Sequence, residues 1–115
     1  MEDPFFYQRT GPEAIRQGME AIRQEVGKVI VGQDRMIEQI LIGLLCDGHL
    51  LIEGVPGVAK TLTAKLMARV VDADFSRIQF TPDLMPSDVV GTSVFNTKSG
   101  EFQFRPGPVF SNIIL

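Results

Sequence analysis

The chain has 115 residues, of which 44% are apolar and 22% charged, and its 11 basic and 14 acidic side chains leave a net charge of −3. This length and composition predict about one small, soluble, globular domain. The basic residues are scattered and mostly interleaved with acidic ones. Nucleic acid is therefore an unlikely partner, because binding to a phosphate backbone usually needs a clustered basic face.

We expect neither a secretory signal nor a membrane span in this chain. Residues 1–10 include Glu2 and Asp3 and lack the basic start and apolar core of a secretory signal. The longest apolar stretch, residues 40–46, falls well short of the roughly 20 residues that a membrane span needs. We expect a cytoplasmic protein that has no membrane partner.

Two amphipathic helices are predicted before residue 48. The first begins near Pro12 and Glu13, and Asp34 is expected to cap the second, which Asp47–Gly48 ends. Their apolar positions recur at helical spacing. These positions are Ile15, Met19, Ile22 and Val26 in the first helix and Ile37, Ile40, Leu41, Leu44 and Leu45 in the second. We expect residues 1–28 to form a helical extension of the domain that follows.

A short apolar run, residues 49–53, is predicted to be a strand that leads into a glycine-bearing loop, residues 54–61. Gly54 and Gly57 permit backbone angles at which successive N–H groups surround a polyphosphate. Lys60 can reach the β and γ phosphates, and the Thr61 hydroxyl can ligate Mg²⁺ at the start of the next helix. The pattern therefore predicts a phosphate-binding loop for a magnesium nucleotide.

Ala59 departs from the general pattern G-x-x-x-x-G-K-[ST], which has glycine before the lysine. The change adds one methyl group. We expect it to be tolerated if Ala59 has helical backbone angles and its Cβ points away from the phosphates.

The loop helix is expected to continue through Leu62, Leu66, Met67 and Val70. Residues 75–80 then read as a second strand, so that strand, helix and strand form a right-handed parallel crossover. A last apolar run, residues 113–115, begins another strand. The fold class is α/β.

Between these strands, residues 85–90 predict a short helical piece, and residues 92–95 and 101–105 the arms of a β-hairpin. Asp83 and Asp88 are expected to cap the short helix rather than to contact nucleotide. Three aromatic residues could bind a partner or pack on the body of the domain, and the sequence leaves both alternatives open. They are Phe102, Phe104 and Phe110.

Four stretches strongly resemble the N-terminal part of MoxR-type ATPases, a branch of the AAA+ superfamily. They are residues 29–33, residues 51–61, residues 77–88 and residues 100–110. Ala59 is common in that family. The resemblance implies a P-loop NTPase core of the αβα type over residues 29–115, with an incomplete parallel sheet and a β-hairpin insert in the second helix.

The same resemblance implies that the cofactors are ATP or ADP with Mg²⁺. It places the Val31–Gly32 backbone near the adenine and the loop around the phosphates, with Thr61 as the metal ligand. The implied nucleotide-binding residues are Val31, Gly32, Gln33, Gly54, Val55, Pro56, Gly57, Val58, Ala59, Lys60, Thr61 and Leu62.

MoxR-type proteins act as chaperones that remodel client proteins or assist metal-cofactor insertion. The resemblance therefore implies a ring, expected to be a hexamer, with a client and a von Willebrand factor A domain protein as partners. The acidic Walker B motif, the sensor residues and the arginine finger are expected beyond Leu115. We expect a fragment that binds ATP without turning it over, and no catalytic residue is assigned to it.

Two alternatives stay open at this point. An ATP-driven nucleic-acid motor would share the superfamily branch and a similar hairpin, and it would bind single-stranded DNA more tightly as salt falls. A non-enzymatic interaction module would fold without binding any nucleotide.

Overall fold

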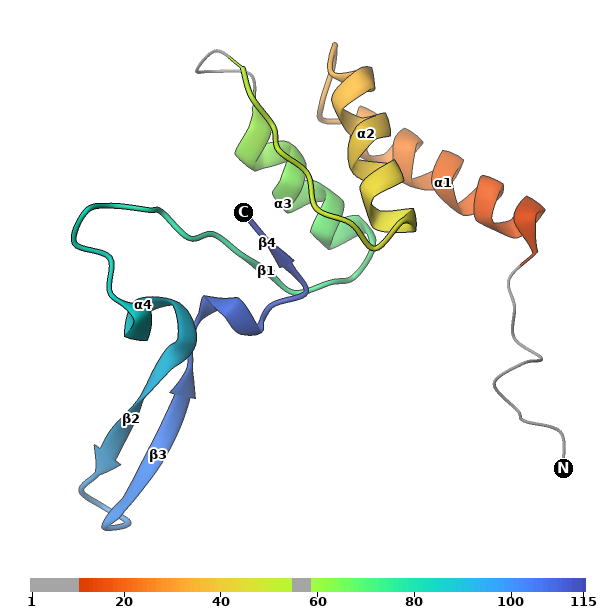
Figure 1. Ribbon diagram of the computed structural model, residues 1–115. Helices are drawn as coiled ribbons and strands as arrows, with labels where there is room; N and C mark the ends of the chain where they lie inside the picture. The colour runs from red at the N-terminus through yellow and green to blue at the C-terminus, as the bar shows by residue number, and fades with distance from the viewer. Residues whose placement is uncertain (1–10, 55–58) are drawn as a thin grey trace, which may run out of the picture. The chain divides into compact units, whose positions relative to one another are not determined.

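A computed structural model describes residues 11–54 and 59–115 of the chain. The chain divides into two compact units, Met1–Thr63 and Ala64–Leu115, and each is described here by itself. Figure 1 shows the elements of both units along the chain.

The first unit is built on two helices, α1 (Pro12–Gly27) and α2 (Asp34–Leu45), which confirm the two predicted amphipathic helices. Pro12 occupies the first helical position, where its missing N–H costs nothing. The helices contact each other, and their buried residues, together with one residue of the connection, form a small apolar core. The core residues are Val26, Ile30, Ile37, Ile40 and Leu41.

Two details of α2 differ from the prediction. Gln33 precedes the helix at the capping position without a side-chain cap, and Asp34 is already the first helical residue. Asp34 therefore does not cap the helix, although its charge lies in the first turn, where it favours the helix dipole. Leu44 and Leu45 are 39% and 56% exposed, so they lie outside the core.

The predicted strand at residues 49–53 is wrong. This stretch has no strand pairing within the described residues, and Leu51 is 86% exposed. Instead, Leu50 lies against α2 at Gly43, where an added Cβ would come within 2.8 Å of Leu50 Cδ1. An extended apolar run becomes a strand only when another strand supplies its hydrogen bonds. Accordingly, the predicted crossover from this stretch to residues 75–80 is not formed.

The parallel pair lies in the second unit and joins β1 (Phe75–Ser76) to β4 (Ile113–Ile114). Flanking backbone bonds extend the pairing, from Ile78 N to Leu115 O at 2.7 Å and from Leu115 N to Ser76 O at 2.9 Å. Both strands were predicted, although β1 is shorter than residues 75–80. The chain thus has an α/β fold with a small parallel sheet. α3 (Lys60–Val70) starts at the predicted position and crosses the boundary between the units.

The predicted short helix and hairpin are confirmed as α4 (Pro86–Val90), β2 (Gly91–Asn96) and β3 (Glu101–Pro106). The hairpin is antiparallel and is followed by the 3₁₀ helix η2 (Pro108–Phe110). Asp88 caps α4 as expected, because its carboxylate accepts a hydrogen bond from Met85 N at 2.9 Å. Asp83 instead accepts a hydrogen bond from the Thr81 hydroxyl, which lowers the pKa of the Asp83 carboxyl.

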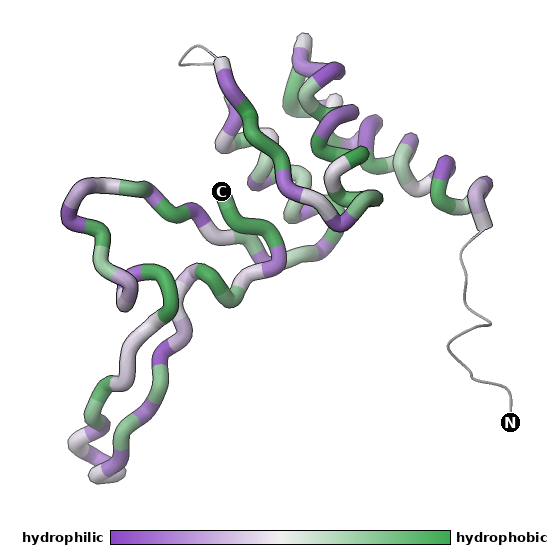
Figure 2. The backbone as a smooth tube through the Cα atoms, viewed as in Figure 1, coloured by the Kyte–Doolittle hydropathy of each residue, from purple (hydrophilic) through white to green (hydrophobic). Residues whose placement is uncertain are grey.

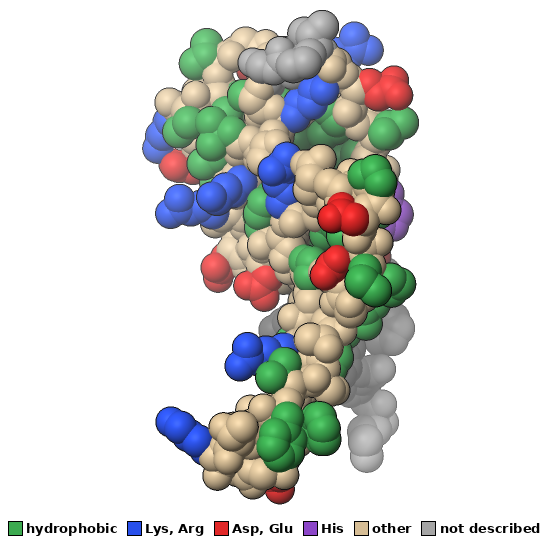
Figure 3. Space-filling model, turned by 90° about the vertical axis from the view of Figure 1, so that its left-hand side faces the viewer, with side chains coloured by type: hydrophobic (Ala, Val, Ile, Leu, Met, Phe, Trp, Pro, Cys, Tyr) green, Lys and Arg blue, Asp and Glu red, His purple; other side chains and the backbone are tan. Residues whose placement is uncertain are grey.

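The two faces of the hairpin differ in chemistry. Cross-strand partners share a face, and the pairs Phe95–Phe102 and Ser93–Phe104 place three phenylalanines on one of them. Figure 2 shows the resulting alternation of hydrophobic and hydrophilic residues along the strands. These rings are at least half exposed, and Phe104 makes an edge contact with Phe110. Figure 3 shows hydrophobic side chains gathered on the hairpin, at the lower end of the view.

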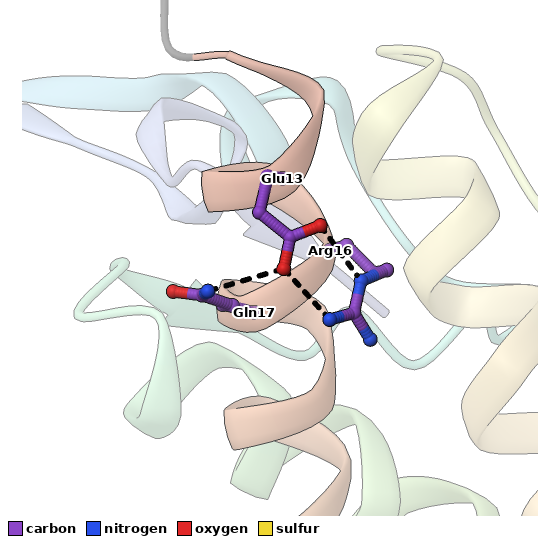
Figure 4. A network of polar contacts seen from close by, with 3 residues as sticks. All are labelled: Glu13, Arg16 and Gln17. Atoms are coloured by element: carbon purple, nitrogen blue, oxygen red, sulfur yellow. Dashed lines mark hydrogen bonds and ion pairs between the residues drawn. The ribbon is translucent and has the colours of Figure 1, made fainter.

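A polar network stabilises the first turns of α1 (Figure 4). Glu13 accepts hydrogen bonds from Arg16 Nη2 at 2.7 Å and from Gln17 Nε2 at 3.1 Å. The bonds from Arg16 and then Gln17 lower the pKa of Glu13 below 4.5. The contribution of these hydrogen bonds to the stability of the folded state is therefore present above pH 4.5, and it is lost as the pH falls through the lowered pKa of Glu13.

None of the described helices is both long and apolar enough to cross a bilayer.

Gly18 lies exposed in the interior of α1, with no atom within 4 Å of the position that a Cβ would take. We expect Gly18→Ala to raise the free energy of unfolding by about 0.5–1 kcal/mol, because alanine loses less backbone entropy in a helix. Thermal unfolding followed by circular dichroism measures the change. The matched control is Ala21→Gly on the same helix, which we expect to lower the free energy of unfolding by a similar amount. A change in the same direction in both variants would contradict this explanation.

Candidate functional site: a pocket at the start of α3

The start of α3 follows residues 55–58, so the predicted phosphate-loop residues Val55, Pro56, Gly57 and Val58 lie outside the described residues. Ala59 has a φ of 54°, in the left-handed region. The condition of helical angles, under which alanine was expected to be tolerated here, is therefore not met. The backbone has the conformation that glycine adopts easily, and alanine adopts it at a cost.

Three backbone N–H groups precede the hydrogen-bond ladder of α3. The Ala59 carbonyl accepts both the Thr63 backbone N–H at 2.9 Å and the Thr63 hydroxyl at 2.8 Å. The N–H groups of Lys60, Thr61 and Leu62 therefore come before the first α-helical bond. Groups in this position, at the positive end of the helix dipole, favour bound anions.

Lys60 reaches back over the start of the loop. Its ammonium group donates a hydrogen bond to the Gly54 carbonyl oxygen at 2.9 Å. The Lys60 side chain therefore joins the two described ends of the predicted phosphate loop by a hydrogen bond. A neutral carbonyl is a weaker partner for an ammonium group than a phosphate oxygen would be.

Lys60 and Gly54 also line a pocket of about 520 Å³ within the first unit. Its volume lies within the range of about 300–1,000 Å³ that is common for small-molecule sites. Helix α2, the residue before it and the stretch that follows it supply the remaining walls. The lining residues are Gln33, Arg35, Met36, Gln39, Ile40, Leu50, Leu51, Ile52, Glu53, Gly54 and Lys60.

The pocket brings together Gln33, Gly54 and Lys60 from the predicted nucleotide-binding set. Val31 and Gly32 lie next to Gln33 in the chain but do not line the pocket, and Val31 is 85% exposed. Ala59, Thr61 and Leu62 lie at the start of α3 beside Lys60 without lining the pocket.

The sequence interpretation missed the wall that α2 contributes. Arg35, Met36, Gln39 and Ile40 lie one helical turn apart in two neighbouring rows of α2. In the sequence these residues look like the solvated side and the core side of an ordinary amphipathic helix. Their proximity in the chain to Gln33 was the available signal.

The donors present fit a magnesium nucleotide. A polyphosphate needs a cation and backbone N–H donors, which Lys60 and the first turn of α3 supply. A hard divalent cation needs an oxygen ligand, and Thr61 carries a hydroxyl at this turn. The remaining pocket walls mix apolar side chains with a few polar ones, as a nucleoside requires.

Replacing Ala59 with glycine is expected to raise the free energy of unfolding by about 1 kcal/mol, because it relieves a left-handed residue that carries a Cβ. Chemical denaturation of both forms measures the difference. Ala68→Gly, at a fully buried helical position of α3, serves as the control, and there we expect a loss of stability. A loss at Ala59 as well would contradict the strain argument.

Comparison with known families gives one matching model. The family described as the ATPase family associated with various cellular activities (AAA) matches residues 49–115. This match covers the pocket residues that follow α2, the predicted phosphate loop and the whole second unit.

Several curated proteins are similar to this chain. Chaperone MoxR1 of Mycobacterium tuberculosis is 55% identical over 91 residues, which are 79% of this chain and 24% of that protein. Uncharacterized protein YeaC of Bacillus subtilis is 49% identical over 92 residues, or 80% of this chain and 29% of that protein. Protein MoxR of Methylorubrum extorquens is 33% identical over 94 residues, which are 82% of this chain and 27% of that protein. The chain spans less than a third of the length of each of these proteins.

A solved structure has the same fold. The crystal structure of a proposed ATPase from Cytophaga hutchinsonii superposes with a TM-score of 0.76 at 53% sequence identity. The match covers 87% of this chain and 30% of that chain.

Proposed function

This chain belongs to the MoxR-type branch of the AAA+ ATPases, and from that premise we propose that it supplies the phosphate-binding part of an ATP site. The single observation that supports the proposal most is the position of Lys60. Its ammonium group lies 2.9 Å from the Gly54 carbonyl at the edge of a pocket large enough for a nucleotide. Family membership implies nucleotide binding in general, and the proposal assigns it to these residues.

In the proposed site, Lys60 exchanges its carbonyl partner for phosphate oxygens, and the N–H groups of Lys60, Thr61 and Leu62 bind the same anion. The Thr61 hydroxyl ligates Mg²⁺. Gln33, with Val31 and Gly32 before it, lies on the nucleoside side. Gly54 and Ala59 flank the phosphate side, and residues 55–58 of the predicted loop lie outside the described residues. When bound, Mg-ATP supplies the phosphoanhydride bond that an ATPase hydrolyses.

For the whole protein, we propose that residues 29–115 are part of the ATP-binding core and that residues 1–28 extend it. The core would work in a cytoplasmic ring, in line with a hexamer, that hydrolyses ATP to remodel a client protein or to assist metal-cofactor insertion. A von Willebrand factor A domain protein is the proposed partner. The printed name of the Mycobacterium tuberculosis relative, a chaperone, supports the remodelling role.

Thermal unfolding of the 115-residue chain with and without Mg-ATP tests the proposal. At a ligand concentration 100 times the dissociation constant, binding stabilises the folded state by about 2.7 kcal/mol. We expect Lys60→Ala to abolish this shift, because the variant removes the cation that lies at the loop. Lys65→Ala on the same helix, whose residue does not line the pocket, is the matched control and should keep the shift.

A folded parent chain that shows no shift with Mg-ATP would overturn the assignment. The interaction-module alternative would then gain support, since the half-exposed phenylalanines of the hairpin are a surface that such a module could use. An equal shift in the parent and in Lys60→Ala would place nucleotide elsewhere on the chain.

A further inference from the structure

The β2–β3 hairpin has a second face, opposite its phenylalanines, that carries mostly polar and basic side chains. Successive residues of a strand point to opposite faces, and cross-strand partners share a face. Figure 3 shows basic side chains at the side of the hairpin away from its cluster of hydrophobic ones. This polar face consists of the pairs Thr92–Arg105, Val94–Gln103 and Asn96–Glu101.

A cavity of about 230 Å³ lies on the polar face and continues into the turn of the hairpin. Val94 and Asn96 are half-buried in its lining, whereas Gln103, Arg105 and the turn residue Lys98 are exposed there. This volume lies below the range of about 300–1,000 Å³ that is common for small-molecule sites. The cavity therefore suits a single side chain of a partner rather than a nucleotide.

The polar groups that line this cavity are mostly hydrogen-bond donors. Asn96 Oδ1 already accepts the backbone N–H groups of Lys98 at 2.9 Å and of Ser99 at 3.4 Å, so its amide N–H groups remain. Lys98 and Arg105 contribute an ammonium and a guanidinium group, which can only donate. Among residues 11–54 and 59–115, neither of these two cations is paired with a carboxylate.

The charges around the cavity favour an anion. The hairpin has one acidic residue, Glu101, which does not line the cavity. Two cations beside one small cavity create a positive local potential. The Arg105 guanidinium can bind a carboxylate through two parallel hydrogen bonds, and the Lys98 ammonium adds a compact charge. A carboxylate side chain matches both the size of the cavity and its donors.

We propose that the polar face binds an acidic peptide segment of a partner protein. A glutamate or aspartate carboxylate of this segment accepts hydrogen bonds from Arg105 and Lys98, and the amides of Gln103 and Asn96 bind the peptide groups beside it. Charge complementarity favours a peptide over a nucleic acid, because a phosphate backbone carries a closely spaced row of charges and needs a longer basic surface than two side chains. This binding requires no nucleotide.

Fluorescence anisotropy of the full chain with a labelled peptide, in which glutamate alternates with serine, tests the site. Alternate residues of an extended peptide lie on the same side, so its carboxylates all face the hairpin together. The comparison peptide has glutamine in place of glutamate. We expect the glutamate peptide to bind about tenfold more tightly, and we expect this difference to shrink as the salt concentration rises.

Two variants remove the cations one at a time from exposed positions. We expect Arg105→Gln to weaken binding of the glutamate peptide by about tenfold, the effect of losing a hydrogen-bonded charge. Lys98→Gln should weaken it by about threefold, because an ammonium group makes a single point contact. Lys65→Gln is the matched control, since Lys65 is exposed on α3 and does not line the cavity, and it should bind as the parent does.

Equal affinity for the two peptides would overturn the acidic-peptide site, and so would unchanged binding of the glutamate peptide in both Arg105→Gln and Lys98→Gln. A parent chain that is folded by circular dichroism and binds neither peptide would also overturn it. Single-stranded oligothymidylate is the third probe. If it bound more tightly than the glutamate peptide at the same salt concentration and lost this binding in Arg105→Gln, the polar face would be a nucleic-acid site instead.

Discussion

Gly91→Ala is expected to lower the free energy of unfolding of the second unit by about 3 kcal/mol or more. Gly91 has a φ of 108° and begins β2, directly after α4. A Cβ added there would lie 2.2 Å from the Arg105 carbonyl oxygen and 2.6 Å from Gly107 N. Both neighbours are backbone atoms, one in β3 and one in the residue that follows it, so neither can move without disturbing the hairpin.

Chemical denaturation that follows the loss of β structure measures this effect from the shift of the midpoint at constant slope. Gly100→Ala is the matched control, since Gly100 has a φ of 71° at the other end of the same hairpin and no atom within 4 Å of its added Cβ. We expect this control to lose only about 1 kcal/mol, the cost of backbone strain alone. Losses of equal size would show that the close approach at Gly91 has no effect.

Leu41→Ala is expected to destabilise the first unit by about 2–5 kcal/mol. Leu41 is 1% exposed and belongs to the small apolar core between α1 and α2. The substitution removes apolar contacts and leaves a cavity that two contacting helices can close only in part. Such a loss is a large fraction of the stability of a small domain, which is typically about 5–15 kcal/mol.

Urea unfolding of the parent and the variant measures the loss, with Leu45→Ala as the control on the same helix. Leu45 is 56% exposed, so its truncation should cost no more than about 0.5 kcal/mol. If both truncations had the same small effect, Leu41 would not be a core residue in solution.

The helices and the hairpin could be predicted because their patterns are local. Ile37, Ile40 and Leu41 recur at helical spacing in the sequence, and they are the buried hydrophobic residues of α2. Phe102 and Phe104 alternate with polar residues, and they lie on one face of the hairpin. The phosphate loop was predicted from the spacing of Gly54, Gly57 and Lys60, and the structure places Gly54 and Lys60 within hydrogen-bonding distance.

The strand at residues 49–53 was predicted wrongly because a strand does not form from a local pattern alone. Its apolar run is compatible with a strand, but strand formation depends on a partner that no local pattern specifies. The prediction that Asp34 caps α2 was wrong by one residue, because the helix begins at Asp34 rather than after it. Arg35 and Gln39 were not predicted as pocket residues, because exposed polar residues on a helix usually face solvent alone.

The sequence by itself determined the helices α1, α2 and α3, the hairpin and the phosphate-loop motif, since each depends on residues close together in the chain. It also determined the family, through short motifs along the chain. The tertiary structure alone decided that β1 pairs with β4, that Leu50 lies on Gly43, and that α2 lines the pocket of Lys60. The first and the last of these features join residues far apart in the sequence, and all three depend on contacts between separate segments of the chain. Their free energy comes from mutual burial and shared hydrogen bonds, which exist only after the chain has folded.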